Sequence, residues 1–168
     1  MGNLDAARPA VRIAAPASVD EWRAARRLVE DYAATLGVDL CFQNLAAELA
    51  NFESEYSAPA GAFRLASEGG HAVGCVALRH FANGSGEIKR LYVAPQARGG
   101  GTGEALVRAI VAAGRQLRYR RLVLDTLPSM TAAQDLYRRL GFRPVAPYRF
   151  NPVPGTVYLE LVLRHDGD

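Results

Sequence analysis

The 168 residues, of which 49% are hydrophobic and 22% charged, have the size and composition of one globular domain spanning 1–168. This composition excludes a disordered protein, and no apolar run reaches the roughly 20 residues that span a bilayer. The net charge of +3 favours anionic ligands, but the arginines are spread along the chain and do not indicate nucleic acid.

The first half of the chain is expected to form short strands and two helices. Val11–Ala17 alternates apolar and polar residues, as a strand does. Ser18 and Glu21 have capping-box spacing, so a helix should follow and end at Gly37. A second helix is expected over 42–56, followed by strands over 63–68 and 72–80 that flank the tight turn Gly69-Gly70.

The second half alternates strands with helices. We expect, in order, a strand over 87–93, a helix over 102–117, a strand over 122–125, a helix over 131–140 and a strand over 157–163. Alternation of this kind indicates an α/β domain built around a partly parallel sheet.

Cysteine and histidine give no sign of a metal or disulfide site. Cys41 and Cys75 form no C-x-x-C motif, and His71, His80 and His165 lack metal-ligand spacing, so no metal is predicted. No secretory signal is visible, and we expect a reduced, cytoplasmic protein. We also expect a flexible segment over 1–10 and no binding to membranes or nucleic acid. A homodimer is compatible with the sequence.

A turn with four glycines joins an expected strand to an expected helix. Without Cβ atoms, its amides can approach a ligand closely at the positive end of the helix dipole, which suits an anion. The dinucleotide-binding pattern G-x-G-x-x-G does not fit in any register, because Glu104 and Leu106 stand where it requires glycine. A P-loop is excluded because no lysine follows the glycines. An anion site and a plain surface turn remain the alternatives for the segment Arg98-Gly99-Gly100-Gly101-Thr102-Gly103.

Three segments in the same order resemble the GNAT superfamily of N-acetyltransferases. They are Glu87–Val93 with the glycine turn, Leu124–Leu127, and the run from Ala133 through Leu136-Tyr137 to Leu140-Gly141-Phe142. The tail, with Pro147-Tyr148, Asn151-Pro152 and Gly155, resembles a bacterial branch of the family whose acceptor is unassigned.

The resemblance implies a mixed, partly parallel central sheet flanked by helices, with a V-shaped splay between the strands at 87–93 and 122–126. Acetyl-CoA, the acetyl donor, would bind in that splay. Its pantetheine arm would pair with the main chain of Leu91, Tyr92 and Val93, and its pyrophosphate would rest on Arg98, Gly99, Gly100, Gly101, Thr102 and Gly103. One departure is Met130, which stands where the family often has an asparagine and offers only a weakly accepting thioether.

The resemblance also implies two catalytic residues. Glu87 is the candidate base for the acceptor amine, and its alternative is a strand carboxylate paired with Arg or Lys. Tyr137 is the candidate proton donor to the departing thiolate, and its alternative is a half-buried aromatic. Because the reference pKa of tyrosine is near 10 and that of a thiol near 8.5, the donation is slightly uphill unless the tyrosine pKa is lowered.

The resemblance further implies that the acceptor enters opposite the donor, between the N-terminal helices and the connection 147–155. Tyr148 and Asn151 offer hydrogen bonds, Arg149 offers a fork for a carboxylate or phosphate, and Gln43 lies across the cleft. No acidic cluster suited to a polyamine or histone tail appears. We therefore predict a small acceptor with an amine and an anionic group, such as an amino acid; alternatively, Arg149 faces solvent and the loop only packs.

These expectations combine into an acetyl-CoA-dependent N-acetyltransferase that acts on a primary amine of a small molecule by direct attack in a ternary complex. The alternative is a non-catalytic acyl-CoA-binding or regulatory module on the same fold. Met130 favours that alternative, whereas Tyr137 and Glu87 weigh against it.

Overall fold

The computed structural model describes residues 8–37 and 44–164. Its elements are β1 (Val11–Ala14), α1 (Val19–Thr35), α2 (Leu45–Ala50), α3 (Phe52–Glu55), β2 (Gly61–Glu68), β3 (His71–His80), β4 (Ser85–Val93), η2 (Pro95–Ala97), α4 (Thr102–Gln116), β5 (Arg121–Thr126), α5 (Thr131–Arg139), β6 (Arg143–Pro144) and β7 (Val157–Val162). Among these residues, no helix is long and apolar enough to cross a membrane.

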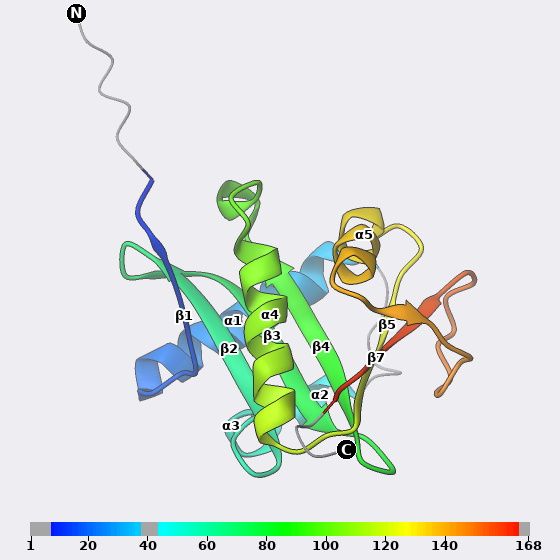
Figure 1. Ribbon diagram of the computed structural model, residues 1–168. Helices are drawn as coiled ribbons and strands as arrows, with labels where there is room; N and C mark the ends of the chain where they lie inside the picture. The colour runs from blue at the N-terminus through cyan, green and yellow to red at the C-terminus, as the bar shows by residue number, and fades with distance from the viewer. Residues whose placement is uncertain (1–7, 38–43, 165–168) are drawn as a thin grey trace, which may run out of the picture.

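One sheet of seven strands runs through the molecule in the order β1-β2-β3-β4-β5-β7-β6. Only β4 and β5 pair in parallel, and the other neighbours are antiparallel. Helix α4 lies across one face and shares its core with α5, whereas α1, α2 and α3 cover the opposite face (Figure 1). The predicted mixed, partly parallel sheet with flanking helices is confirmed.

Strands β4 and β5 separate because β4 carries a bulge. Cys75 of β3 pairs with Tyr92 and Ala77 pairs with Lys89, so β4 has one residue more than β3 in this interval. Arg90 lies there with a left-handed φ of 58°. A bulged strand bends, and the ladder between β4 and β5 accordingly ends at Glu87. Beyond that residue the two strands diverge, as the V-shaped splay requires.

Local sequence signals explain the ends of several elements. Ser18 Oγ, at the N-cap of α1, accepts from the Glu21 amide at 3.1 Å, and Glu21 Oε2 reaches back to accept from the Ala17 amide at 2.6 Å. Gly69 and Gly70, with φ of 57° and 82°, make the tight hairpin turn between β2 and β3.

The structure differs from the prediction in one predicted helix and in one strand that was not predicted. The helix expected over 42–56 is divided into α2 and α3 at Asn51, whose backbone leaves the helical region with φ of −116° and ψ of 23°. Residues 42 and 43 of that helix lie outside the described residues, as do residues 1–7 of the segment expected to be flexible. The short strand β6 was not predicted.

Candidate active site

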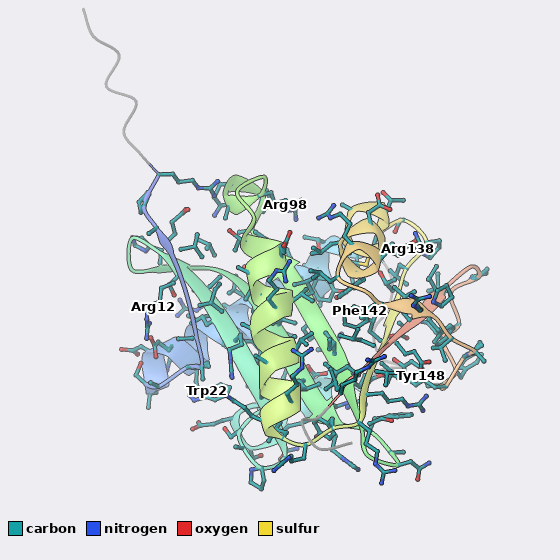
Figure 2. All side chains as sticks on the ribbon, in the orientation of Figure 1. Arg12, Trp22, Arg98, Arg138, Phe142 and Tyr148 are labelled. Carbon is teal, nitrogen blue, oxygen red and sulfur yellow. The ribbon has the colours of Figure 1, made fainter. Side chains whose placement is uncertain are left out.

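A groove of about 380 Å³ opens beside the part of β4 that has left β5. We call it the turn groove. It is lined by Leu91, Tyr92 and Val93 of β4, by Arg98, Gly99, Gly101, Thr102 and Gly103 of the glycine turn, and by residues of α5 from Met130 to Leu136. Figure 2 shows Arg98 above the N-terminal end of α4 and Arg138 on the neighbouring α5. The structure thus brings together every residue predicted to hold the donor except Gly100, which lies against Arg8.

The free edge of β4 offers main-chain groups to the turn groove. The Ala94 amide donates to the Val73 carbonyl at 2.8 Å, so Ala94 faces β3. Because main-chain groups alternate along a strand, those of Leu91 and Val93 face away from β3, toward the groove. Arg98 Nε donates to the Val93 carbonyl at 2.8 Å, and its guanidinium lies 6.0 Å from the centre of the Tyr92 ring.

The glycine turn has the features of an anion site. The amides of Thr102, Gly103 and Glu104 open α4 and have no partner within the helix, which carries no side-chain cap. A Cβ atom placed on Gly99 or Gly101 would meet nothing within 4 Å, so the space over the turn is open. The buried Thr102 hydroxyl has no hydrogen-bond partner anywhere in 8–37 and 44–164. These donors fit the pyrophosphate of acetyl-CoA.

Met130 lies at the start of α5, where the family resemblance would place an asparagine. The Thr126 hydroxyl lies 3.7 Å from its sulfur and donates to it. Its side chain lines both the turn groove and the smaller cavity described below. The thioether therefore stands at the junction of the two spaces.

Tyr137 is buried on α5, with 5% of its surface exposed, and its ring packs edge-on against Phe142 at 5.3 Å. Burial, with smaller contributions from Tyr32 and Asp125, raises the pKa of this phenol above its usual value. The shift is opposite to the one that would ease full proton transfer. The neutral hydroxyl is suited to donating a hydrogen bond.

Glu87 is fully buried and holds three side chains. Its Oε1 accepts from Arg79 Nε at 3.0 Å, and its Oε2 accepts from the Tyr148 hydroxyl and from Arg149 Nη1, both at 2.9 Å. Burial opposes the ionisation of Glu87, but the charges of Lys89, Arg149 and Arg79 outweigh it and lower the carboxyl pKa. A carboxylate bonded in this way is a poor base. The contacts favour the alternative interpretation of Glu87, a strand carboxylate paired with arginine.

The residues predicted to meet the acceptor are tied to the sheet. Tyr148 and Arg149 bond Glu87, and only 16% of the Arg149 side chain is exposed, so it does not simply face solvent. Asn151 Nδ2 donates to Asp125 Oδ2 at 3.0 Å, and its Oδ1 accepts from the Val153 amide at 3.0 Å. Gln43 lies outside the described residues.

A second, smaller cavity of about 30 Å³ adjoins the turn groove, and Tyr32 and Met130 line both. We call it the Asp125 cavity; its lining is Tyr32, Leu36, Arg90, Asp125, Thr126, Leu127, Met130 and Asn151. Sequence reasoning assigned no role to Tyr32, Arg90 or Asp125. The available signal was a charged residue near the end of the apolar strand next to the splay, at Asp125.

Replacing Glu87 by glutamine distinguishes the two roles considered for this carboxylate. Because Glu87 positions Tyr148 and Arg149, we expect Glu87→Gln to lower turnover by roughly 10–100-fold and by the same factor at every pH from about 6 to 9. The measurement is the pH profile of kcat, with KM for the acceptor, and Glu160→Gln as the control, since Glu160 also pairs with an arginine at 3.0 Å. Recovery of the rate at high pH would instead identify Glu87 as the base.

The family model and the curated proteins that match this chain point to the same family. Residues 23–142 match the model of the acetyltransferase (GNAT) family. An uncharacterized N-acetyltransferase of Schizosaccharomyces pombe is 41% identical over 148 residues, which cover 87% of this chain and 89% of that protein. The N-acetylaspartate synthetase of Rattus norvegicus is 34% identical over 110 residues, covering 64% of this chain but 37% of that protein.

Among solved structures, a Salmonella typhimurium acetyltransferase with its cofactor acetyl-CoA has a TM-score of 0.70 at 17% identity, covering 95% of this chain and 97% of that one. This similarity shows the same fold. The expected bacterial branch is not supported, because the Schizosaccharomyces pombe relative is fungal and matches nearly the whole chain.

Proposed function

Because this chain belongs to the GNAT family of N-acetyltransferases, which use acetyl-CoA as acetyl donor, we propose that it acetylates the primary amine of a small molecule that also carries an anionic group. The transfer is direct, with donor and acceptor bound together. The observation that carries the proposal is the divergence of β4 and β5 after Glu87, with open hydrogen-bond donors on one side and a polar cavity on the other.

The turn groove holds the donor. Acetyl-CoA supplies an acetyl group activated as a thioester. In the proposal, the amides at the start of α4 and the Thr102 hydroxyl bind the pyrophosphate, while the main-chain groups of Leu91 and Val93 that face away from β3 bind the pantetheine arm. Arg98 either keeps its bond to the Val93 carbonyl or gives way to the ligand there.

The acceptor binds on the side of the loop 147–155. Arg149 Nη1 donates to Glu87 Oε2 at 2.9 Å, and the guanidinium carries further N–H groups that can meet the acceptor. A planar guanidinium with N–H groups to spare favours an anionic group on the acceptor. The relative named N-acetylaspartate synthetase also favours an amino acid, since the product in its name is an acetylated amino acid.

The amine must be neutral when it attacks. For a lysine-like amine with a reference pKa near 10.4, losing the proton at pH 7 costs about 4.6 kcal/mol. Since the Glu87 pKa is lowered, we assign deprotonation to water and expect the rate to rise with pH toward the amine pKa. Tyr137 supplies a hydrogen bond to the sulfur as negative charge develops there.

Replacing Tyr137 by phenylalanine removes that hydrogen bond and keeps the ring. We expect Tyr137→Phe to lower kcat by roughly 10–100-fold while the affinity for acetyl-CoA stays within about twofold. Because the raised pKa keeps the phenol protonated, the loss should be uniform across neutral pH. Tyr119→Phe is the control, since Tyr119 is also buried and follows the other end of α4. Loss of acetyl-CoA binding would show that Tyr137 only packs.

Calorimetry with acetyl-CoA, ATP and NADH, followed by thiol release with a panel of primary amines, tests the function itself. We expect binding of acetyl-CoA alone, and thiol release only when an amine is present. Met130 favours the second candidate, a non-catalytic acyl-CoA-binding module, because it replaces a polar side chain at the junction of the two spaces. Binding of acetyl-CoA without thiol release with any amine would select that module.

A further inference from the structure

Asp125 occupies the position on β5 that the divergence of β4 exposes. The ladder between the two strands ends at Val123, and Asp125 follows two residues later on the same face. Leu122 and Leu124, on the other face, are buried in the core under α4. The Asp125 carboxylate therefore points toward the α1 side of the sheet, where Tyr32 closes the Asp125 cavity.

The cavity suits one small charged group with several N–H donors. Its volume of about 30 Å³ is close to the space of one water molecule. Tyr32 and Thr126 line it together with Asp125 and with Arg90, whose guanidinium is already bound to Glu48. Asp125 Oδ2 accepts from Asn151, whereas Oδ1 has no hydrogen bond to any residue in the described part of the chain. A carboxylate oxygen that is free in this way favours a cationic donor.

We propose that Asp125 binds the amino group of the acceptor in this cavity, an inference that rests on the proposed function. The carboxylate pairs with the ammonium form on arrival. After one proton has left for water, the nitrogen lone pair attacks the thioester carbonyl, the C–N bond forms and the C–S bond breaks. The nitrogen loses its second proton and the sulfur takes one up, so one proton is released overall.

The carboxylate contributes to catalysis as well as to binding. The attacking nitrogen becomes positively charged as its bond to carbon forms, and a fixed negative charge beside it stabilises that state. Tyr137 lies close enough that the charge of Asp125 adds to the rise of its pKa. Tyr32 and Met130, which line both spaces, place this carboxylate next to the turn groove. The amine held by Asp125 would thus lie next to the space that takes the thioester.

The test compares the best amino acid acceptor with the same acid lacking its amino group, such as aspartate and succinate. In the parent protein we expect the deaminated acid to inhibit with a Ki at least tenfold above the KM of the acceptor, because it lacks the group that Asp125 binds. In Asp125→Asn we expect the acceptor KM to rise at least tenfold, the Ki of the deaminated acid to stay the same or fall, and acetyl-CoA affinity to stay within twofold.

Asp135→Asn is the matched control, since Asp135 is exposed on α5 and only approaches Arg138 at 3.9 Å. If Asp125→Asn still favours the amino acid tenfold over its deaminated analogue, the proposal for Asp125 is overturned and the proposed function stands. Equal affinity of the parent protein for the two acids also overturns it, and this measurement needs no variant. Absence of thiol release with every amine overturns both.

Discussion

Replacing Glu48 by glutamine should lower the free energy of unfolding by about 3–5 kcal/mol, because it removes the carboxylate from a buried ion pair. Glu48 and Arg90 are 3% and 4% exposed, and two bonds of 3.1 and 2.7 Å join them. Lys89 Nζ lies 3.8 Å from the same carboxylate. Two cations would then share a low-dielectric site without their counter-ion. For a chain of this length the melting temperature should fall by on the order of 10 °C.

The electrostatics of this cluster agree with that expectation. Burial opposes the ionisation of Glu48, but Arg90 and Lys89 outweigh it and lower the carboxyl pKa. Burial, and then the charge of Arg90, lower the pKa of Lys89 to about 8. A carboxyl with a lowered pKa stabilises the fold above its ordinary pKa of 4.5 and ceases to do so as the pH falls through the lowered value.

Denaturant unfolding at neutral pH measures this prediction, and Glu30→Gln is its control. Glu30 pairs with Arg26 one helical turn away, with both side chains 48% exposed, so its loss should cost less than about 0.5 kcal/mol. If Glu48→Gln changes stability no more than Glu30→Gln does, the buried ion pair contributes no more to the fold than an exposed one.

Gly101→Val should weaken acetyl-CoA binding at least tenfold while the protein remains folded. Gly101 precedes α4 with a φ of 81°, a conformation in which a β-branched residue is strained by roughly 1–2 kcal/mol. No atom lies within 4 Å of the added Cβ, so the core is not disturbed. Relief of the strain moves the amides at the start of α4, and the new side chain occupies the space over the turn.

Gly70→Val is a closely matched control. Gly70 has a φ of 82° and equally open surroundings, but it lies in the hairpin between β2 and β3. Calorimetry with acetyl-CoA should show normal affinity for Gly70→Val and at least tenfold weaker binding for Gly101→Val, at comparable melting temperatures. Equal affinities would place the pyrophosphate elsewhere.

The sequence was most informative where one residue type determines the local backbone. The glycine turn, the capping box of Ser18 and Glu21, and the hairpin glycines each impose a conformation that depends on few neighbours, and these elements were predicted. The break at Asn51 was missed because a helical apolar stripe continues across it, although the backbone of Asn51 itself is not helical. The divergence of β4 and β5 followed from the family resemblance and not from periodicity.

The polar contacts of the site could not be predicted, because they join residues far apart in the sequence. Glu87 looks like a free carboxylate until the loop 147–155 folds back and places Tyr148 and Arg149 on it. Asp125 looks like an ordinary end of a strand until Tyr32 of α1 and Asn151 close a cavity around it. Such pairings depend on tertiary packing, and local sequence patterns do not reveal which distant residues will meet.

The ratio of kcat/KM for amino acids to kcat/KM for polyamines and basic peptides tests the central claim most directly. The assay follows thiol release from acetyl-CoA and identifies the acetylated product by mass, with aspartate and glutamate against spermidine and a lysine-rich peptide. With the guanidinium of Arg149 beside the acceptor, we predict that kcat/KM for the best amino acid exceeds that for the best polyamine or peptide at least about tenfold. Faster acetylation of spermidine or of the lysine-rich peptide would contradict this account.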